Sequence, residues 1–209
     1  MEKPREQILR RLDESLAVLE KSLAGLPEKN WHIKLAPERW SIGEIVHHLV
    51  LVEVQRLQMM KEMLAGRRES VPPRTEAIAD IASYRHKPQS VQTIEMMQPT
   101  PDLPAKTLLL SFRRGRTETR AFASNIDLKQ LQNIWLVTKS FGPLNGAEYL
   151  EFLAAHTERH ADQIQEVRKE LLRRSFFLQN FQKLVTASAF SEAVSYIRKD
   201  RFGKKNASR

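Results

Sequence analysis

The sequence contains no cysteine among its 209 residues. This absence excludes disulfide bonds, thiolate zinc sites, iron–sulfur clusters and a cysteine nucleophile. A metal ion bound by this chain must therefore be held by histidine, aspartate, glutamate or amide oxygens. Apolar residues make up 41% of the chain and charged residues 28%, which is typical of a globular protein rather than a disordered chain or a multi-pass membrane protein.

Long apolar runs are also missing. No segment approaches the roughly 18 apolar residues that a membrane span requires. The segment 1–10 is charged and lacks the apolar core of a secretory signal. We therefore expect a soluble, cytoplasmic protein.

The net charge of +9 is concentrated at one end of the chain. Residues 173–209 contain nine Lys or Arg and two Asp or Glu, a balance of +7, whereas residues 1–172 carry only +2. Positive charge that could attract nucleic acid is therefore a property of the C-terminal segment.

Glycine is scarce, with seven residues, and the ten prolines are clustered. Because proline breaks helix interiors but is tolerated in loops and first turns, the proline-free stretches predict helices. These stretches are 5–26, 38–71, 105–142 and 144–209, and they predict an all-α fold, an up-down four-helix bundle. Segment 67–103 has five prolines and no sustained periodicity, so we expect a long crossover between the second and third helices, with a short helix near Thr75 to Tyr84.

Apolar residues in the proline-free stretches recur at steps of three and four, as on one face of a helix. The second helix is predicted to begin at Ser41, which forms an S-x-x-E capping box with Glu44, and to end near Gly66. We expect the third helix at about 104–124 and the fourth to begin with Asn145 as its cap. The predicted core stripes include Ile8, Leu12, Leu19, Ile45, Leu49, Val52, Leu108, Phe112, Leu150, Leu153 and Ile164.

Three histidines fall within or beside these stripes. His156 and His160 are four residues apart, so their side chains leave the same face of the fourth helix. On the second helix His48 lies with the core stripe, whereas the adjacent His47 is turned away by about 100°. If the second and fourth helices lie side by side, His48, His156 and His160 converge on one point.

Three neutral imidazoles suit a divalent zinc, nickel or iron ion. Three protein ligands leave one position open, as in catalytic zinc sites, so the ion would provide a hydroxide nucleophile or a place to bind a thiolate. The alternative is a core histidine pair satisfied by hydrogen bonds, because H-x-x-x-H alone is a weak signal. The metalloprotease motif H-E-x-x-H is excluded, since Thr157 follows the first histidine.

Two stretches of the sequence resemble the DinB-like (DinB/YfiT) superfamily of metal-binding four-helix-bundle proteins. They are ERWSIGEIVHHLVLVE, residues 38–53, and FGPLNGAEYLEFLAAHTERHADQI, residues 141–164. The matching residues are Trp40, Ser41, His48, His156, His160, Gln163 and Ile164. The resemblance covers about residues 5–172, and it implies a bundle domain over 1–172, a dimer, and a metal ion bound by His48, His156 and His160. It leaves hydrolysis and transfer of a small-molecule thiol both open.

No general base is evident from the sequence. Glu44 is one turn before His48 but also serves the predicted cap, Gln163 can orient a ligand histidine, and Glu158 is expected to face solvent. We expect Trp31 and Trp40 to pack over the end of the bundle, with a place at the mouth of a substrate site as the alternative.

Four arginines make the third helix basic: Arg113, Arg114, Arg116 and Arg120. Such a run usually marks a solvated face. Contact with an anionic substrate is the alternative.

The extension at 173–209 contains five of the nine phenylalanines, Phe176, Phe177, Phe181, Phe190 and Phe202. We expect it to form one or two amphipathic helices packed on the bundle or across a dimer. Aromatic residues among Lys and Arg also suit nucleic acid or an anionic membrane surface. The sequence thus favours a metal-dependent hydrolase or S-transferase, and leaves as its alternative a non-catalytic dimeric scaffold whose extension binds nucleic acid or another anionic partner.

Overall fold

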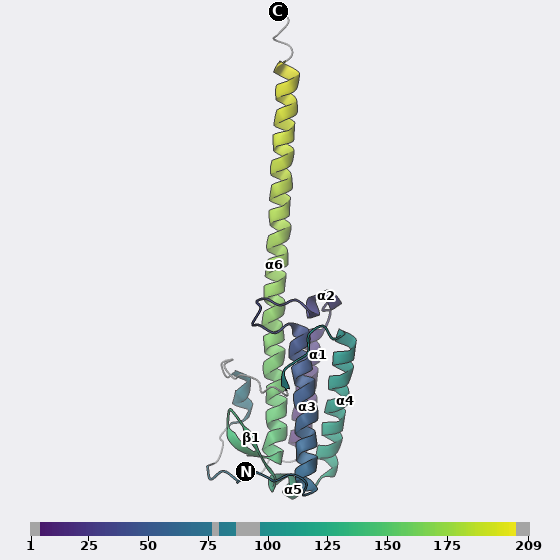
Figure 1. Ribbon diagram of the computed structural model, residues 1–209, viewed down its shortest axis with the longest axis vertical. Coiled ribbons are helices and arrows are strands. Elements are labelled where there is room, and N and C mark those ends of the chain that lie inside the picture. Colours follow the sequence, from purple (N-terminus) through teal and green to yellow (C-terminus); the bar gives the residue numbers. More distant parts are fainter. Residues whose placement is uncertain (1–4, 77–79, 87–96, 204–209) are drawn as a thin grey trace, which may run out of the picture. The chain divides into compact units, whose positions relative to one another are not determined.

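The computed structural model describes residues 5–76, 80–86 and 97–203, and it divides into two compact units between Val167 and Arg168 (Figure 1). The first unit contains a bundle of four helices, which confirms the predicted all-α four-helix-bundle fold. The bundle helices are α1 (Arg5–Leu23), α3 (Ile42–Leu64), α4 (Ala105–Asn125) and the part of α6 (Gly146–Gly203) that precedes the border between the units.

Short elements connect the bundle helices. They are α2 (Glu28–Trp31), the 3-10 helix η1 (Ala82–His86), α5 (Leu128–Gln132) and the strands β1 (Trp135–Thr138) and β2 (Gly142–Asn145). Of the short helix expected near Thr75 to Tyr84, residues 82–84 lie in η1, whereas residues 77–79 cannot be compared with the expectation. Residues 77–79 and 87–96 of the predicted crossover lie outside the described residues.

The two helices that carry the histidine candidates both begin with a capping box, which the sequence predicted for α3, while for α6 it predicted Asn145 as the cap. The Glu44 backbone N–H donates to Ser41 Oγ at 3.2 Å, and the Ser41 N–H donates to the Glu44 carboxylate at 2.8 Å. At the start of α6 the Glu148 N–H donates to Asn145 Oδ1 at 3.0 Å, and the Asn145 N–H donates to the Glu148 carboxylate at 2.9 Å. Each box satisfies backbone donors that a helix start leaves unpaired, and so fixes where α3 and α6 begin.

A β-hairpin precedes α6, where the sequence had indicated only a connection. β1 and β2 are antiparallel, with Trp135 opposite Asn145 and Thr138 opposite Gly142. Gly142 has φ +67°, a left-handed conformation that suits glycine in a tight turn, and the Thr138 side chain accepts the Phe141 N–H at 3.0 Å. Four-residue strands are too short to show a clear alternating pattern in the sequence.

Arg116 on α4 is buried, with an exposed fraction of 1%, so the prediction that it belongs to a solvated face is wrong. Its guanidinium pairs with Glu53 of α3 at 2.9 Å. It also donates to the Leu12 carbonyl, to Ser15 Oγ and to Thr157 Oγ1, at 3.0, 2.7 and 2.8 Å. This one arginine therefore links all four bundle helices.

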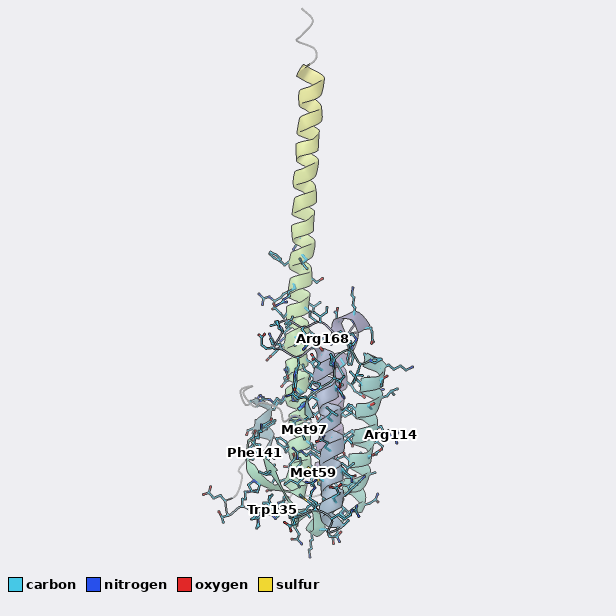
Figure 2. All side chains as sticks on the ribbon, in the orientation of Figure 1. Met59, Met97, Arg114, Trp135, Phe141 and Arg168 are labelled. Carbon is cyan, nitrogen blue, oxygen red and sulfur yellow. The ribbon has the colours of Figure 1, made fainter. Side chains whose placement is uncertain are left out.

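The other three arginines of α4 do lie on a solvated face. Arg113, Arg114 and Arg120 pair with Glu20, Glu118 and Asp13 respectively, at 2.6–3.1 Å. Figure 2 shows Arg114 pointing away from the bundle. These pairs give no support to contact between α4 and an anionic substrate.

The described part of the C-terminal extension is one helix, the continuation of α6 through Gly203. Its apolar side chains Leu172, Phe176, Phe177 and Leu178 are exposed. A domain border after residue 172 stays a prediction. Within the described ranges, no helix is both long enough and apolar enough to cross a membrane.

Candidate metal centre

His48 lies on the buried face of α3, with an exposed fraction of 5%. Its Nδ1 is 3.0 Å from the backbone carbonyl of Met97. Because a carbonyl can only accept, Nδ1 carries the proton and Nε2 presents a lone pair. The adjacent His47 is turned away, as predicted, and its Nδ1 accepts the Thr100 N–H at 2.8 Å.

His156 and His160 lie on α6 where that helix is buried on every side. Residues 149–161 include no exposed position. His160 Nδ1 is 2.8 Å from Gln163 Oε1, so Nδ1 donates and Nε2 again presents a lone pair. Gln163 therefore orients a candidate ligand, which is the structural role considered for it above.

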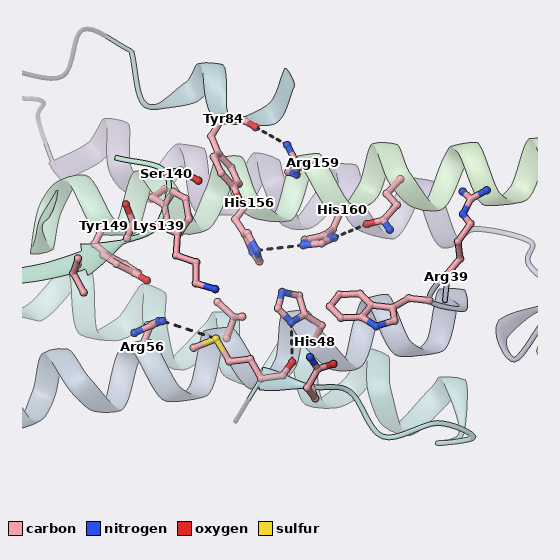
Figure 3. Close-up of a pocket in the computed structure, with 18 of the residues that line it drawn as sticks. Arg39, His48, Arg56, Tyr84, Lys139, Ser140, Tyr149, His156, Arg159 and His160 are labelled. Carbon is pink, nitrogen blue, oxygen red and sulfur yellow. Dashed lines mark hydrogen bonds between the residues drawn. The ribbon is translucent and has the colours of Figure 1, made fainter. Parts of the chain in front are cut away.

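The structure brings the three predicted histidines together (Figure 3). One ring nitrogen from each of His48, His156 and His160 lies within 4.8 Å of the other two, and no carboxylate joins this group among the described residues. The Nε2 atoms of His156 and His160 are 3.2 Å apart. Two nitrogens that bind one tetrahedral ion at about 2.0–2.1 Å are separated by about 3.3 Å, so this spacing fits a shared metal ion.

All three imidazoles are held neutral. Burial is the main cause that lowers the pKa of each ring, and it lowers the pKa of His160 to about 3. Neighbouring positive charge adds to the effect: a charged His48 would disfavour a charged His156 or His160, as would Arg159. Neutral rings with available lone pairs are the form in which histidine binds a metal.

A cavity of about 1100 Å³ opens onto the three rings. Its walls come from α3, from α6, from the hairpin, from the crossover and from the segment before α3. Figure 3 shows Tyr149 and Arg56 at one end of this cavity and Arg39 at the other, with the histidines between them. The volume is sufficient for a small-molecule ligand.

A family model described as the DinB superfamily matches residues 11–164. The chain belongs to the DinB superfamily. The match includes all three histidines, and it confirms the resemblance found in the sequence.

Two solved structures share the fold of this DinB superfamily member. One is YfiT from Bacillus subtilis, described as a probable metal-dependent hydrolase with an unusual four-helix bundle topology. Its sequence is 13% identical to this chain, and the two structures match with a TM-score of 0.54. The match covers 81% of this chain and 93% of YfiT. The other is an uncharacterized protein from Clostridium difficile 630, which is 8% identical, with a TM-score of 0.58 over 81% and 98% of the two chains. At these identities the likeness concerns the fold alone. A comparison with curated proteins found no match.

Glu158 does not face solvent, which corrects the sequence-based expectation. Its exposed fraction is 4%, and its carboxylate pairs with Arg11 of α1 at 2.8 Å and lies 4.0 Å from Arg85 of η1. The expectation assumed that α6 has one buried face, whereas this segment of α6 is buried all round. Glu158 therefore joins α6 to α1 and η1 and is not placed to act on a substrate.

Glu44 and the two tryptophans have distinct positions. Glu44 pairs with Lys34 at 2.9 Å in addition to capping α3, so its role is structural. Trp31 is buried, as expected for packing over the bundle end. Trp40 lines the cavity, and its ring centroid is 4.9 Å from that of His48. Its place at the mouth of a substrate site stays a prediction.

Several cavity residues were not identified as functional candidates from the sequence: Arg56, Tyr84, Lys139, Tyr149 and Arg159. A signal existed for Arg56, which is the one polar interruption of the apolar stripe of α3. Lys139 lies in the hairpin that was not predicted, and no pattern in the sequence marks it.

Proposed function

We propose that this DinB superfamily member is a metal-dependent enzyme in which His48, His156 and His160 bind one divalent ion, zinc, nickel or iron. The observation that carries the proposal is the convergence of three neutral, buried imidazoles beside a cavity. Two of the three rings have Nδ1 held by an acceptor, which leaves Nε2 for the ion. The name of the B. subtilis structure, a probable metal-dependent hydrolase, supports the same class of activity.

A divalent ion in this site supplies Lewis-acid chemistry, which lowers the pKa of a water molecule or of a small-molecule thiol. The chain's own residues prepare the site for it. Three uncharged ligands would leave the positive charge of the ion uncompensated, and the aromatic rings of Trp40, Tyr84 and Phe152 lie beside the histidine rings. Because the chain has no cysteine, a thiol transferred by this enzyme has to be a low-molecular-weight cosubstrate.

Elemental analysis of the purified protein tests the metal site. We expect about one divalent ion per chain in the wild type, and loss of the ion in His48→Ala, His156→Ala and His160→Ala. His47→Ala is the matched control, because His47 is adjacent to His48 but lies outside the group, and it should keep the ion. A wild type that binds no added zinc, nickel or iron would exclude the proposal.

A substrate panel then separates the two reactions. Esters and amides turned over by the metal-loaded protein without added thiol would identify a hydrolase. Turnover of electrophiles that depends on an added small thiol would identify an S-transferase. In either case His48→Ala should abolish the turnover.

The exposed aromatic side chains of α6 support a second candidate, a scaffold that binds nucleic acid. Phe176 and Phe177 both have exposed fractions of 69%, and they follow Arg173 and Arg174. Bases stack on exposed aromatic rings beside positive charge. This function predicts binding to single-stranded DNA that weakens steeply with salt and that is lost when residues 173–209 are deleted. Unchanged binding after the deletion would contradict it.

A further inference from the structure

Arg56 presents a guanidinium for which the described residues provide no anionic partner. Its Nη1 is 3.1 Å from Met59 Sδ and its Nη2 is 3.9 Å from Met97 Sδ, and its Nε is buried without a hydrogen-bond partner. Thioether sulfur is a weak acceptor. A partly buried cation whose hydrogen-bond acceptors are only thioethers retains unsatisfied donors, which is unfavourable unless a ligand supplies acceptors.

Cationic side chains outnumber carboxylates in the cavity wall. Arg56, Lys139 and Arg159 line it, Arg39 lies at its other end, and Glu38 is the one carboxylate among its described lining residues. A divalent ion on three neutral histidines would add further positive charge. The electrostatics of the cavity therefore favour an anionic ligand.

Arg56 lies at a definite separation from the histidines. It is two helical turns after His48 on α3, so their Cα atoms are about 12 Å apart along the helix axis. Figure 3 shows Arg56 beside Tyr149, and the guanidinium carbon is 5.8 Å from the centre of that ring.

Tyr149 makes this end of the cavity suitable for a planar anionic group. Burial is the main cause that raises the pKa of its hydroxyl, to about 12, so the hydroxyl keeps its proton and remains a donor at neutral pH. Val52 and Met97 are apolar lining residues of the same cavity. The planar guanidinium fork of Arg56 matches the two oxygens of a carboxylate, which it can bind through two parallel N–H···O bonds.

We propose that the cavity binds a small molecule with a carboxylate, that Arg56 pairs with this carboxylate in a bidentate manner, and that the reacting group of the same molecule lies at the three histidines. The inference rests on the proposed function only for the location of the reacting group. Arg56 is thus assigned as a substrate-binding residue, and the carboxylate and the reacting group are expected to lie on the order of 12 Å apart, as the Cα atoms of Arg56 and His48 do along α3.

Binding of 4-fluorobenzoate and of its uncharged analogue 4-fluorobenzamide, followed by ¹⁹F NMR, tests the assignment. The metal is first removed with a chelator, because a carboxylate could otherwise bind the ion directly. We expect the wild type to bind the benzoate at least roughly tenfold more tightly than the benzamide. Arg56→Gln should lower the affinity for the benzoate roughly 10- to 100-fold and leave the affinity for the benzamide unchanged. Arg56→Lys should lower the affinity for the benzoate less, because lysine keeps the charge but lacks the planar fork of arginine.

Arg39→Gln is the matched control, since it removes one positive charge from the same cavity at the other end. It should change benzoate binding by less than roughly threefold, because distant charges in a solvated cavity are screened. The assignment is overturned if the benzoate preference survives Arg56→Gln, if Arg39→Gln weakens binding equally, or if the wild type binds neither probe. Circular dichroism and thermal unfolding verify that each variant is folded. Metal content is measured separately, so loss of the metal site and loss of the carboxylate site are distinguishable.

Discussion

At the scale of single residues, the centre depends on which nitrogen of each ring carries the proton. Met97 and Gln163 are acceptors for Nδ1 of His48 and His160, so both rings present Nε2 toward the common point. The Met97 acceptor is a backbone carbonyl from the crossover, and no side-chain substitution removes it. Gln163 is a side chain, one helical turn after His160, and its role can be tested.

Replacing Gln163 with leucine removes the acceptor while keeping the approximate volume. We expect the zinc affinity of Gln163→Leu to fall roughly 10- to 100-fold, because partners that orient ligand histidines typically contribute this much. Gln163→Glu should keep or raise the affinity, since a carboxylate is a stronger acceptor for Nδ1–H. Competition with a chromophoric chelator measures both values. Gln165→Leu, at an exposed position on the same helix, is the control and should keep the zinc affinity of the wild type. If Gln165→Leu lowers the zinc affinity as much as Gln163→Leu, the effect does not depend on the hydrogen bond to His160.

At the scale of elements, the helices and the convergence of the three histidines could both be predicted from local patterns in the sequence. Caps and apolar periodicity are local signals, and the boundaries of α3 and α4 lie within one or two residues of those predicted from Ser41, Gly66 and the stretch 104–124. Because His48 and the pair on α6 occupy buried stripes, the same periodicity that indicated the helices also indicated that these rings converge.

Features that depend on packing between elements were not predictable in this way. Arg116 and Glu158 look like surface residues because their partners, Glu53 and Arg11, are distant in the sequence and on other helices. The hairpin is too short to produce a pattern. The cationic wall of the cavity combines Arg56 of α3 with Arg159 of α6 and Lys139 of the hairpin, and such a group is evident only in three dimensions.

The buried Arg116–Glu53 pair leads to a prediction about the bundle helices. Arg116→Met leaves the Glu53 carboxylate buried without its counter-ion, so we expect the free energy of unfolding to fall by about 3–5 kcal/mol. Adding Glu53→Met to this variant should recover part of the loss, because the uncompensated charge is then removed. Urea unfolding followed by circular dichroism measures both effects.

Arg114→Met provides the control on the same helix. Arg114 is two residues from Arg116, its side chain is 84% exposed, and it pairs with Glu118 one turn away. Its substitution should change the free energy of unfolding by less than about 1 kcal/mol. If the two methionine variants are equally stable, the buried pair does not hold the helices together.

At the scale of the whole molecule, the three histidines make the stability of the metal-free protein depend on pH. In the folded chain burial lowers the pKa of each ring, that of His160 to about 3, whereas the unfolded chain binds protons at the ordinary value of about 6.5. Below pH 6.5 the unfolded state therefore binds more protons than the folded state, and stability falls as the pH falls. Each ring lowers the free energy of unfolding by up to about 1.4 kcal/mol per pH unit as the pH falls through the interval between its unfolded-state and folded-state pKa values.

We expect the chelator-treated protein to lose several kcal/mol of unfolding free energy between pH 7.5 and pH 5, measured by urea unfolding at each pH. The variant with His48, His156 and His160 all replaced by glutamine should lose distinctly less over this range, because it lacks the three groups whose proton uptake on unfolding causes the loss. Equal slopes in the two proteins would show that the rings are not held neutral by burial. A bound ion excludes protons from the ligand nitrogens, so loading the wild type with zinc should raise its stability at pH 7.5 and make the fall toward pH 5 steeper, as protons displace the metal.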